Sequence, residues 1–147
     1  MSYNKNNLKE LAWQVEEKID EYRSMRKFNC EQLEQLYDGL RKGIDVSVYA
    51  NEQFDAKQME QVKLGLLKGL NVSLYVRPDF SWAQMYQVRH GLENGVNVLV
   101  YAKPEFGWEQ MNEIRLGILA GVDITRYAKH SISWIQMRKV RYSMSSI

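Results

Sequence analysis

The 147-residue chain has little of several residue types that mark particular protein classes. Its single cysteine, Cys30, excludes an intramolecular disulfide, which agrees with a reducing compartment. No apolar run approaches the roughly 18 residues that a membrane-spanning helix needs. Met1 and Ser2 begin neither a secretory signal nor a lipidation motif. We therefore expect a soluble, cytoplasmic protein that does not bind membranes.

The chain also lacks a strong excess of charge of either sign. The net charge of +2 and a pI near 8.6 are too weak a bias to indicate nucleic-acid binding. The distribution is uneven, because residues 28–53 contain two basic and five acidic residues, whereas residues 132–147 contain three basic residues and no acidic one. The sequence predicts an acidic early region and a basic end.

Residues typical of catalytic or metal sites are also few. The two histidines, His90 and His130, have no cysteine or histidine partner at metal-binding spacing, so we expect no metal site and no cofactor. Carboxylate pairs such as Glu109 and Glu113 are typical of solvated helix faces. No GxSxG motif surrounds the C-terminal serines, and no glycine stretch matches a phosphate-binding loop. We predict that the protein is not an enzyme.

What the sequence does contain is a pattern that recurs every 26 residues. Aromatic or aliphatic residues mark its starts at Phe28, Phe54, Phe80, Phe106 and Ile132. This period gives complete repeats at 28–53, 54–79, 80–105 and 106–131 and a partial repeat at 132–147. We predict a single repeat domain over residues 1–147, in which residues 1–27 form an N-terminal cap.

Each repeat begins with the signals of a helix start. In the second repeat Asp55 is the predicted N-cap, and Gln58 follows at capping-box spacing. Phe54 and Met59 flank this cap as a hydrophobic staple. We expect the helix to continue for about 14 residues, until Gly69 adopts a left-handed conformation. The local cap is our explanation for the glutamine that recurs in every repeat.

The second half of each repeat is predicted to be another, shorter helix of about six residues. Pro78 and Pro104 follow this helix in two repeats. The first helix also keeps an internal glycine, as at Gly117, although glycine there costs roughly 1 kcal/mol relative to alanine. We expect the helix of the neighbouring repeat to approach the backbone at this glycine. Stacked units of this kind predict an all-α fold, a right-handed α-solenoid of helical-hairpin repeats.

Residues 1–27 are predicted to form one amphipathic helix. Asn7 and Glu10 have capping-box spacing, and apolar residues recur with a helical period from Leu8 to Met25. The opposite face is charged. A repeat array needs such an end element with one polar face, so we interpret this helix as the N-terminal cap.

The repeat resembles a short helical tandem-repeat family of gut-dwelling Gram-positive bacteria and their mobile elements. The resemblance covers residues 28–142 and is carried best by Gln110-Met111, Ile114-Arg115, Gly117 and the segment 123–128. The first repeat departs most, with Tyr37 in the basic column and Glu52 in place of proline. The resemblance implies a helical repeat fold and a bacterial or phage origin. It implies no activity.

One flank of the helices carries residues that the repeat pattern does not explain. From the third repeat onward, a tryptophan and an arginine stand seven residues apart on the same side of each long helix. Tryptophan and arginine are the residues most enriched in binding hot spots. The predicted binding residues are Trp82, Arg89, Trp108, Arg115, Trp134, Arg138 and Arg141.

This flank has two interpretations. It is either the surface through which a non-catalytic module recognises another macromolecule, most simply a protein, or a ladder in which each arginine covers a tryptophan and pairs with an acid of the neighbouring repeat. The concave face of the stack is a second candidate surface. Two other functions stay open. One is a nucleic-acid-binding repeat protein, which interleaved aromatic and basic side chains favour. The other is a mobile-element-encoded inhibitor of a host defence enzyme, which the resemblance suggests.

Overall fold

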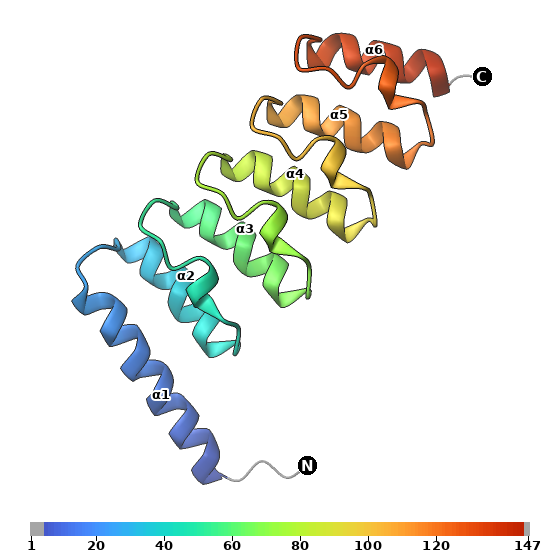
Figure 1. Cartoon of the computed structure of the whole chain (residues 1–147). Helices are drawn as coiled ribbons and strands as arrows, with labels where there is room; N and C mark the ends of the chain where they lie inside the picture. Colours follow the sequence, from blue (N-terminus) through green and yellow to red (C-terminus); the bar gives the residue numbers. More distant parts are fainter. Residues whose placement is uncertain (1–4, 146–147) are drawn as a thin grey trace. The chain divides into compact units, whose positions relative to one another are not determined.

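A computed structural model describes residues 5–145, and the chain is all-helical over this range. Six α-helices and four short 3-10 helices make up the described residues, which contain no strand (Figure 1). The all-α prediction is confirmed. The chain divides into two compact units, one ending at Lys68 and one beginning at Gly69.

The first unit contains three α-helices and one 3-10 helix: α1 (Lys5–Ser24), α2 (Cys30–Arg41), η1 (Val46–Val48) and α3 (Ala56–Leu67). Helix α2 packs against both α1 and α3. The C-terminal half of α1 buries Ile19 and Tyr22, whereas Leu8 and Leu11 in its first half are exposed. The predicted cap at Asn7 is wrong, because Asn7 already lies inside α1.

The second unit contains the remaining elements: η2 (Val72–Leu74), α4 (Trp82–Glu93), η3 (Val98–Val100), α5 (Trp108–Leu119), η4 (Ile124–Arg126) and α6 (Trp134–Ser145). Helices α4, α5 and α6 lie side by side, each packed against the next (Figure 1). Their core contains the staple residues predicted from the sequence, including Phe80, Met85, Phe106, Met111 and Met137, of which the methionines are fully buried.

The predicted capping boxes are confirmed at the starts of α2, α3 and α4. At α4 the Ser81 hydroxyl accepts from the Gln84 amide at 3.2 Å, and Gln84 Oε1 accepts from the Ser81 amide at 2.8 Å. At α5 the cap residue is Gly107, so only half of the box exists: Gln110 Oε1 accepts from the Gly107 amide at 2.8 Å. The repeat boundaries therefore coincide with capped helix starts.

The recurring glutamine has a second role that a local cap does not explain. Gln84 Nε2 donates to the carbonyl oxygen of Phe106 at 2.6 Å, and Gln110 Nε2 donates to that of Ile132 at 2.6 Å. Each acceptor precedes the N-cap of the next helix. Gln32 does the same with Phe54 O, at 2.6 Å. One side chain thus caps its own helix and fixes the start of the following one.

Both predicted helix lengths need correction. Each long helix of the repeats has 12 residues rather than about 14, and each second helix is a three-residue 3-10 turn rather than a helix of about six. At three of these turns the N-cap side chain accepts from the backbone amide two residues ahead, as Asp123 Oδ1 does from the Thr125 amide at 3.2 Å. The long helices end where predicted, since Gly69 and Gly95 have φ of +67° and +72°.

The internal helix glycine also has a different partner from the predicted one. The Tyr127 hydroxyl donates to the Glu113 carbonyl at 3.2 Å and lies over Gly117. Tyr101 likewise donates to Gln87 O at 2.8 Å, over Gly91. The expected approach of a neighbouring helix is therefore wrong for these glycines. The group that occupies the space of a Cβ atom at these glycines is a tyrosine of the same repeat.

Candidate functional site

Trp82 and Trp108 are the first residues of α4 and α5 and leave 41% and 45% of their surfaces exposed. A hydrogen bond from Gln84 to the Phe106 carbonyl links the starts of these two packed helices. The two side chains border a hollow of about 430 Å³. Two large, half-exposed aromatic side chains are thus held on neighbouring rigid elements.

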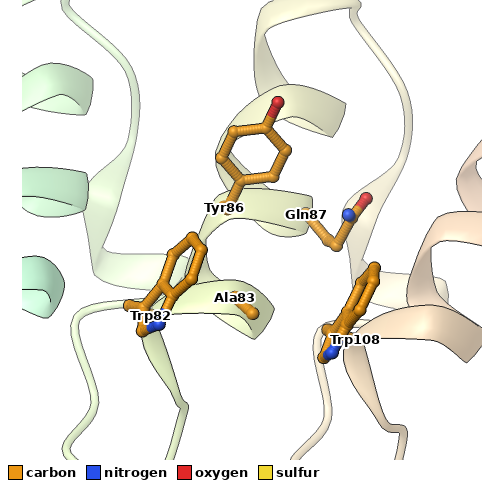
Figure 2. A pocket seen from close by; sticks show the side chains of 5 residues that line it. All are labelled: Trp82, Ala83, Tyr86, Gln87 and Trp108. Carbon is orange, nitrogen blue, oxygen red and sulfur yellow. The ribbon is translucent and has the colours of Figure 1, made fainter.

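The hollow has a simple construction (Figure 2). The indoles of Trp82 and Trp108 stand on opposite sides, and the small side chain of Ala83 lies between them. Tyr86 lies one turn further along α4, and Gln87 completes the lining on the side of α5. Aromatic and methyl groups make most of this surface. The site can accept a flat or aliphatic group between two rings, and none of the side chains lining it is acidic or basic.

Arg89, by contrast, is only 7% exposed. It forms an ion pair with Glu93 one turn later on α4, and its guanidinium lies 5.4 Å from the centre of the Tyr86 ring. A guanidinium held in this way stabilises α4 rather than projecting toward a partner. The sequence analysis grouped Arg89 with Trp82 as binding residues, but only Trp82 is exposed.

Arg115 on α5 reaches back to the preceding helix. Its Nε donates to Gln87 Oε1 on α4 at 3.2 Å, and its Nη2 donates to Asn112 Oδ1 at 2.9 Å. The first of these bonds joins two repeats, because Gln87 and Arg115 lie on α4 and α5. This is the contact that the structural interpretation of the flank predicted, although the acceptor is an amide and not an acid.

Glu113 gives the clearest example of such a contact. Its side chain is fully buried, and its two carboxylate oxygens accept from Arg138 Nε and Arg141 Nε of α6, each at 2.9 Å. The predicted solvated position for Glu113 is wrong. A buried carboxylate needs paired donors, which here come from residues 25 and 28 positions later.

Trp134 occupies the same position on α6 as Trp82 and Trp108 do on their helices, yet its surroundings differ. It is only partly exposed, and the Arg138 guanidinium lies 4.9 Å from its ring centre. Arg138 keeps 44% of its side chain exposed while it binds Glu113. A cationic group thus covers the tryptophan ring at the start of α6.

The first unit contains the equivalent cationic contact. Lys63 on α3 is 8% exposed, and its Nζ lies 2.8 Å from Asp38 Oδ2 on α2. Lys63 and Lys42 together hold the pKa of the Asp38 carboxyl below its ordinary value. The basic column therefore joins adjacent helices in both units. The structural interpretation of the flank included a pairing with an acid of the neighbouring repeat, but it did not identify Asp38 as the partner of Lys63.

The seven predicted site residues fall into three groups. Trp82 and Trp108 face solvent around a shared hollow. Arg89, Arg115 and Arg141 bind side chains of the protein itself, and Trp134 and Arg138 contact each other on α6. Within residues 5–145, no three side chains of histidine, cysteine, aspartate and glutamate gather in a way that could hold a metal ion. None of the helices in that range has both the length and the apolar character needed to cross a bilayer.

Comparison of the chain with known protein families, with curated proteins and with solved structures found no match.

Proposed function

We propose that the protein is a non-catalytic binding module that recognises another protein through a surface built by its repeats. We further propose that the repeats continue through the whole chain as a right-handed α-solenoid, since the 26-residue pattern runs without interruption from Phe28 to the partial repeat at 132–147. In such an array equivalent positions of successive repeats form rows, and rows are what binding surfaces of repeat proteins consist of.

The observation that supports this function is the pair of half-exposed indoles of Trp82 and Trp108 around one hollow. Burial of an aromatic side chain of this size removes a large apolar area from water. The fold leaves much of that area unburied at two successive repeats. Tryptophan in a pocket next to rigid elements is the usual core of a protein–protein interface.

Nucleic-acid binding has less support. Contacts to phosphate require cationic groups on the surface, and the salt dependence of such binding reports their number. Arg89, Arg115 and Arg141 are instead engaged with Glu93, Gln87 and Glu113 inside the second unit. The aromatic side chains stay exposed while most of the cationic ones do not, which favours a protein as the partner.

The test compares capture of binding partners by the parent protein and by the Trp82→Ala, Trp108→Ala double variant, with the captured proteins identified by mass spectrometry. Trp13→Ala is the matched control, because Trp13 is an equally large and even more exposed tryptophan on α1. We expect one protein to be captured by the parent and the control and lost with the double variant. Equal capture by all three proteins would contradict the proposal, as would salt-sensitive binding of DNA that ignores the two tryptophans.

A further inference from the structure

The spacing of the exposed tryptophans restricts the shape of a ligand that can reach more than one of them. Helices that pack against each other have axes roughly 8–10 Å apart. Helices α4, α5 and α6 pack in succession, and Trp82, Trp108 and Trp134 each begin one of them. The row therefore presents one indole for each interhelical step, along a line that crosses the helices.

A polyproline II helix has the matching period. It has three residues per turn and rises 3.1 Å per residue, so every third side chain returns to the same side after about 9 Å. A β-strand repeats its side after two residues, or roughly 6.6 Å, which does not match one interhelical step. An extended segment with proline or another apolar residue at every third position can therefore place one such residue at each tryptophan.

The hollow between Trp82 and Trp108 suits a proline ring. Its lining is mainly aromatic and methyl surface, with Ala83 leaving space between the two indoles (Figure 2). Proline-rich segments bind aromatic grooves in this way and lose little conformational entropy, because their extended form exists before binding.

Charge also distinguishes the two ends of the row. On α4 the cation of Arg89 is balanced by Glu93. On α6, Arg138 and Arg141 share the single carboxylate of Glu113, and Arg138 keeps 44% of its side chain exposed beside Trp134. Residues 132–147 contain no acid. The α6 end thus carries unbalanced positive charge that complements an acidic group.

We propose that the row of Trp82, Trp108 and Trp134 binds a proline-rich segment of a partner protein in the polyproline II conformation, with apolar residues at every third position and an acidic residue next to α6. This inference rests on the proposed function, since it names the chemistry of the partner. A segment of about seven residues spans the row, because the two interhelical steps from α4 to α6 cover roughly 16–20 Å and each residue rises 3.1 Å.

The direct test is a fluorescence titration with a synthetic peptide of about twelve residues. The peptide carries proline at every third position and two aspartates after the last proline, with a second version that carries the aspartates before the first proline. Trp13→Phe is used as the background, so that the remaining tryptophan emission comes from the row itself. We expect saturable binding for at least one of the two versions. Each version can place its acids at α6 only by running in its own direction, so the comparison also reports the direction of the bound chain.

Three protein variants and two further peptides make the result specific. Trp82→Ala and Trp108→Ala should each weaken binding at least about tenfold, as loss of a hot-spot side chain does. Leu99→Ala should not, although Leu99 is an exposed apolar residue of the same unit. A peptide of the same composition with proline at every fourth position, and one with lysines in place of the aspartates, should both bind weakly.

Equal binding of peptides with proline at every third and every fourth position would overturn the inference, and so would failure of both aspartate-bearing versions to bind. Preferential binding of an oligothymidine with loss in the tryptophan variants would show that the row serves nucleic acid instead. The proposed function fails separately: if partner capture depends on Trp82 and Trp108 but no proline-rich peptide competes for it, the module binds a protein by another chemistry. If capture ignores both tryptophans, the function itself is wrong.

Discussion

The hydroxyl group of Tyr127 occupies the space that a Cβ atom on Gly117 would need. It donates to the Glu113 carbonyl at 3.2 Å, in the middle of α5. A Cβ built on Gly117 would lie closer than 3.0 Å to this hydroxyl and to Ile124 Cγ2. The internal glycine thus lets the 3-10 turn of the repeat fold back onto its own helix.

Gly117→Ala should therefore destabilise the protein, although alanine is the better helix former by roughly 1 kcal/mol. We expect a net loss of about 1–3 kcal/mol in the free energy of unfolding, typical of an overpacked core. Chemical denaturation measures it. In a Tyr127→Phe background the loss should be smaller, because the nearest clashing atom is gone. An increase in stability on Gly117→Ala, or an equal loss in both backgrounds, would contradict this account.

The recurring glutamine provides the second prediction. Gln84 caps α4 and also donates to the carbonyls of Phe106 and Pro104, so Gln84→Ala removes three hydrogen bonds and leaves a buried acceptor with fewer partners. We expect a loss of about 2 kcal/mol, which exceeds the ~1 kcal/mol typical of a cap alone.

Gln136 is the matched control, because it has the same place in the repeat on α6 but an exposed side chain. Gln136→Ala should reduce the unfolding free energy by no more than a cap does. Similar losses for Gln84→Ala and Gln136→Ala would show that the bond between repeats contributes nothing to stability.

These contacts show which parts of the structure the sequence could predict. The helix starts depend on residues within four positions of each other, such as Ser81 and Gln84, and their spacing was readable directly. The length of the second helix could not be read in this way, because the chain must bring the Tyr127 hydroxyl to a carbonyl oxygen 14 residues earlier. Periodicity alone cannot determine that geometry.

The candidate site was likewise predictable only in part. The row of tryptophans follows from the 26-residue period, since equivalent residues of packed helices must be neighbours. The burial of Glu113 could not be inferred from its own helix, because its partners, Arg138 and Arg141, come from the next one. A signal was nevertheless present: Glu113 replaces a glutamine found in three earlier repeats, and α6 is the helix with additional arginines.

The third prediction concerns pH. Lys63 and Lys42 approach Asp38 Oδ2 at 2.8 and 3.0 Å and hold the pKa of this carboxyl below its ordinary value of 3.8. A carboxyl with a lowered folded-state pKa stabilises the protein above its unfolded-state pKa, and this contribution disappears as the pH falls through the folded-state value.

Asp38→Asn should therefore reduce stability at neutral pH, by less than about 1 kcal/mol because the carboxylate is partly exposed. The difference from the parent protein should shrink as the pH falls below ~4. Urea denaturation at a series of pH values measures it. Asp20→Asn on α1 is the control, since its exposed pair with Arg23 should contribute little. A difference that is constant down to pH ~2, well below the ordinary pKa of an aspartate, would contradict the assigned role.

The last prediction separates the two side chains that the sequence had grouped together. Arg89 is 7% exposed and paired with Glu93, so Arg89→Glu would place two carboxylates together at a largely buried position. Breaking a buried ion pair costs about 3–5 kcal/mol. For a chain of this size that corresponds to a fall of roughly 10 °C in melting temperature. Trp82→Ser removes a side chain that is 41% exposed at the first position of α4, and the melting temperature should fall much less. Partner capture should show the opposite order, with the loss greater for Trp82→Ser than for the fraction of Arg89→Glu that remains folded. If Arg89→Glu leaves the melting temperature unchanged and abolishes capture, the arginine belongs to the binding surface, and its contact with Glu93 is not what stabilises α4.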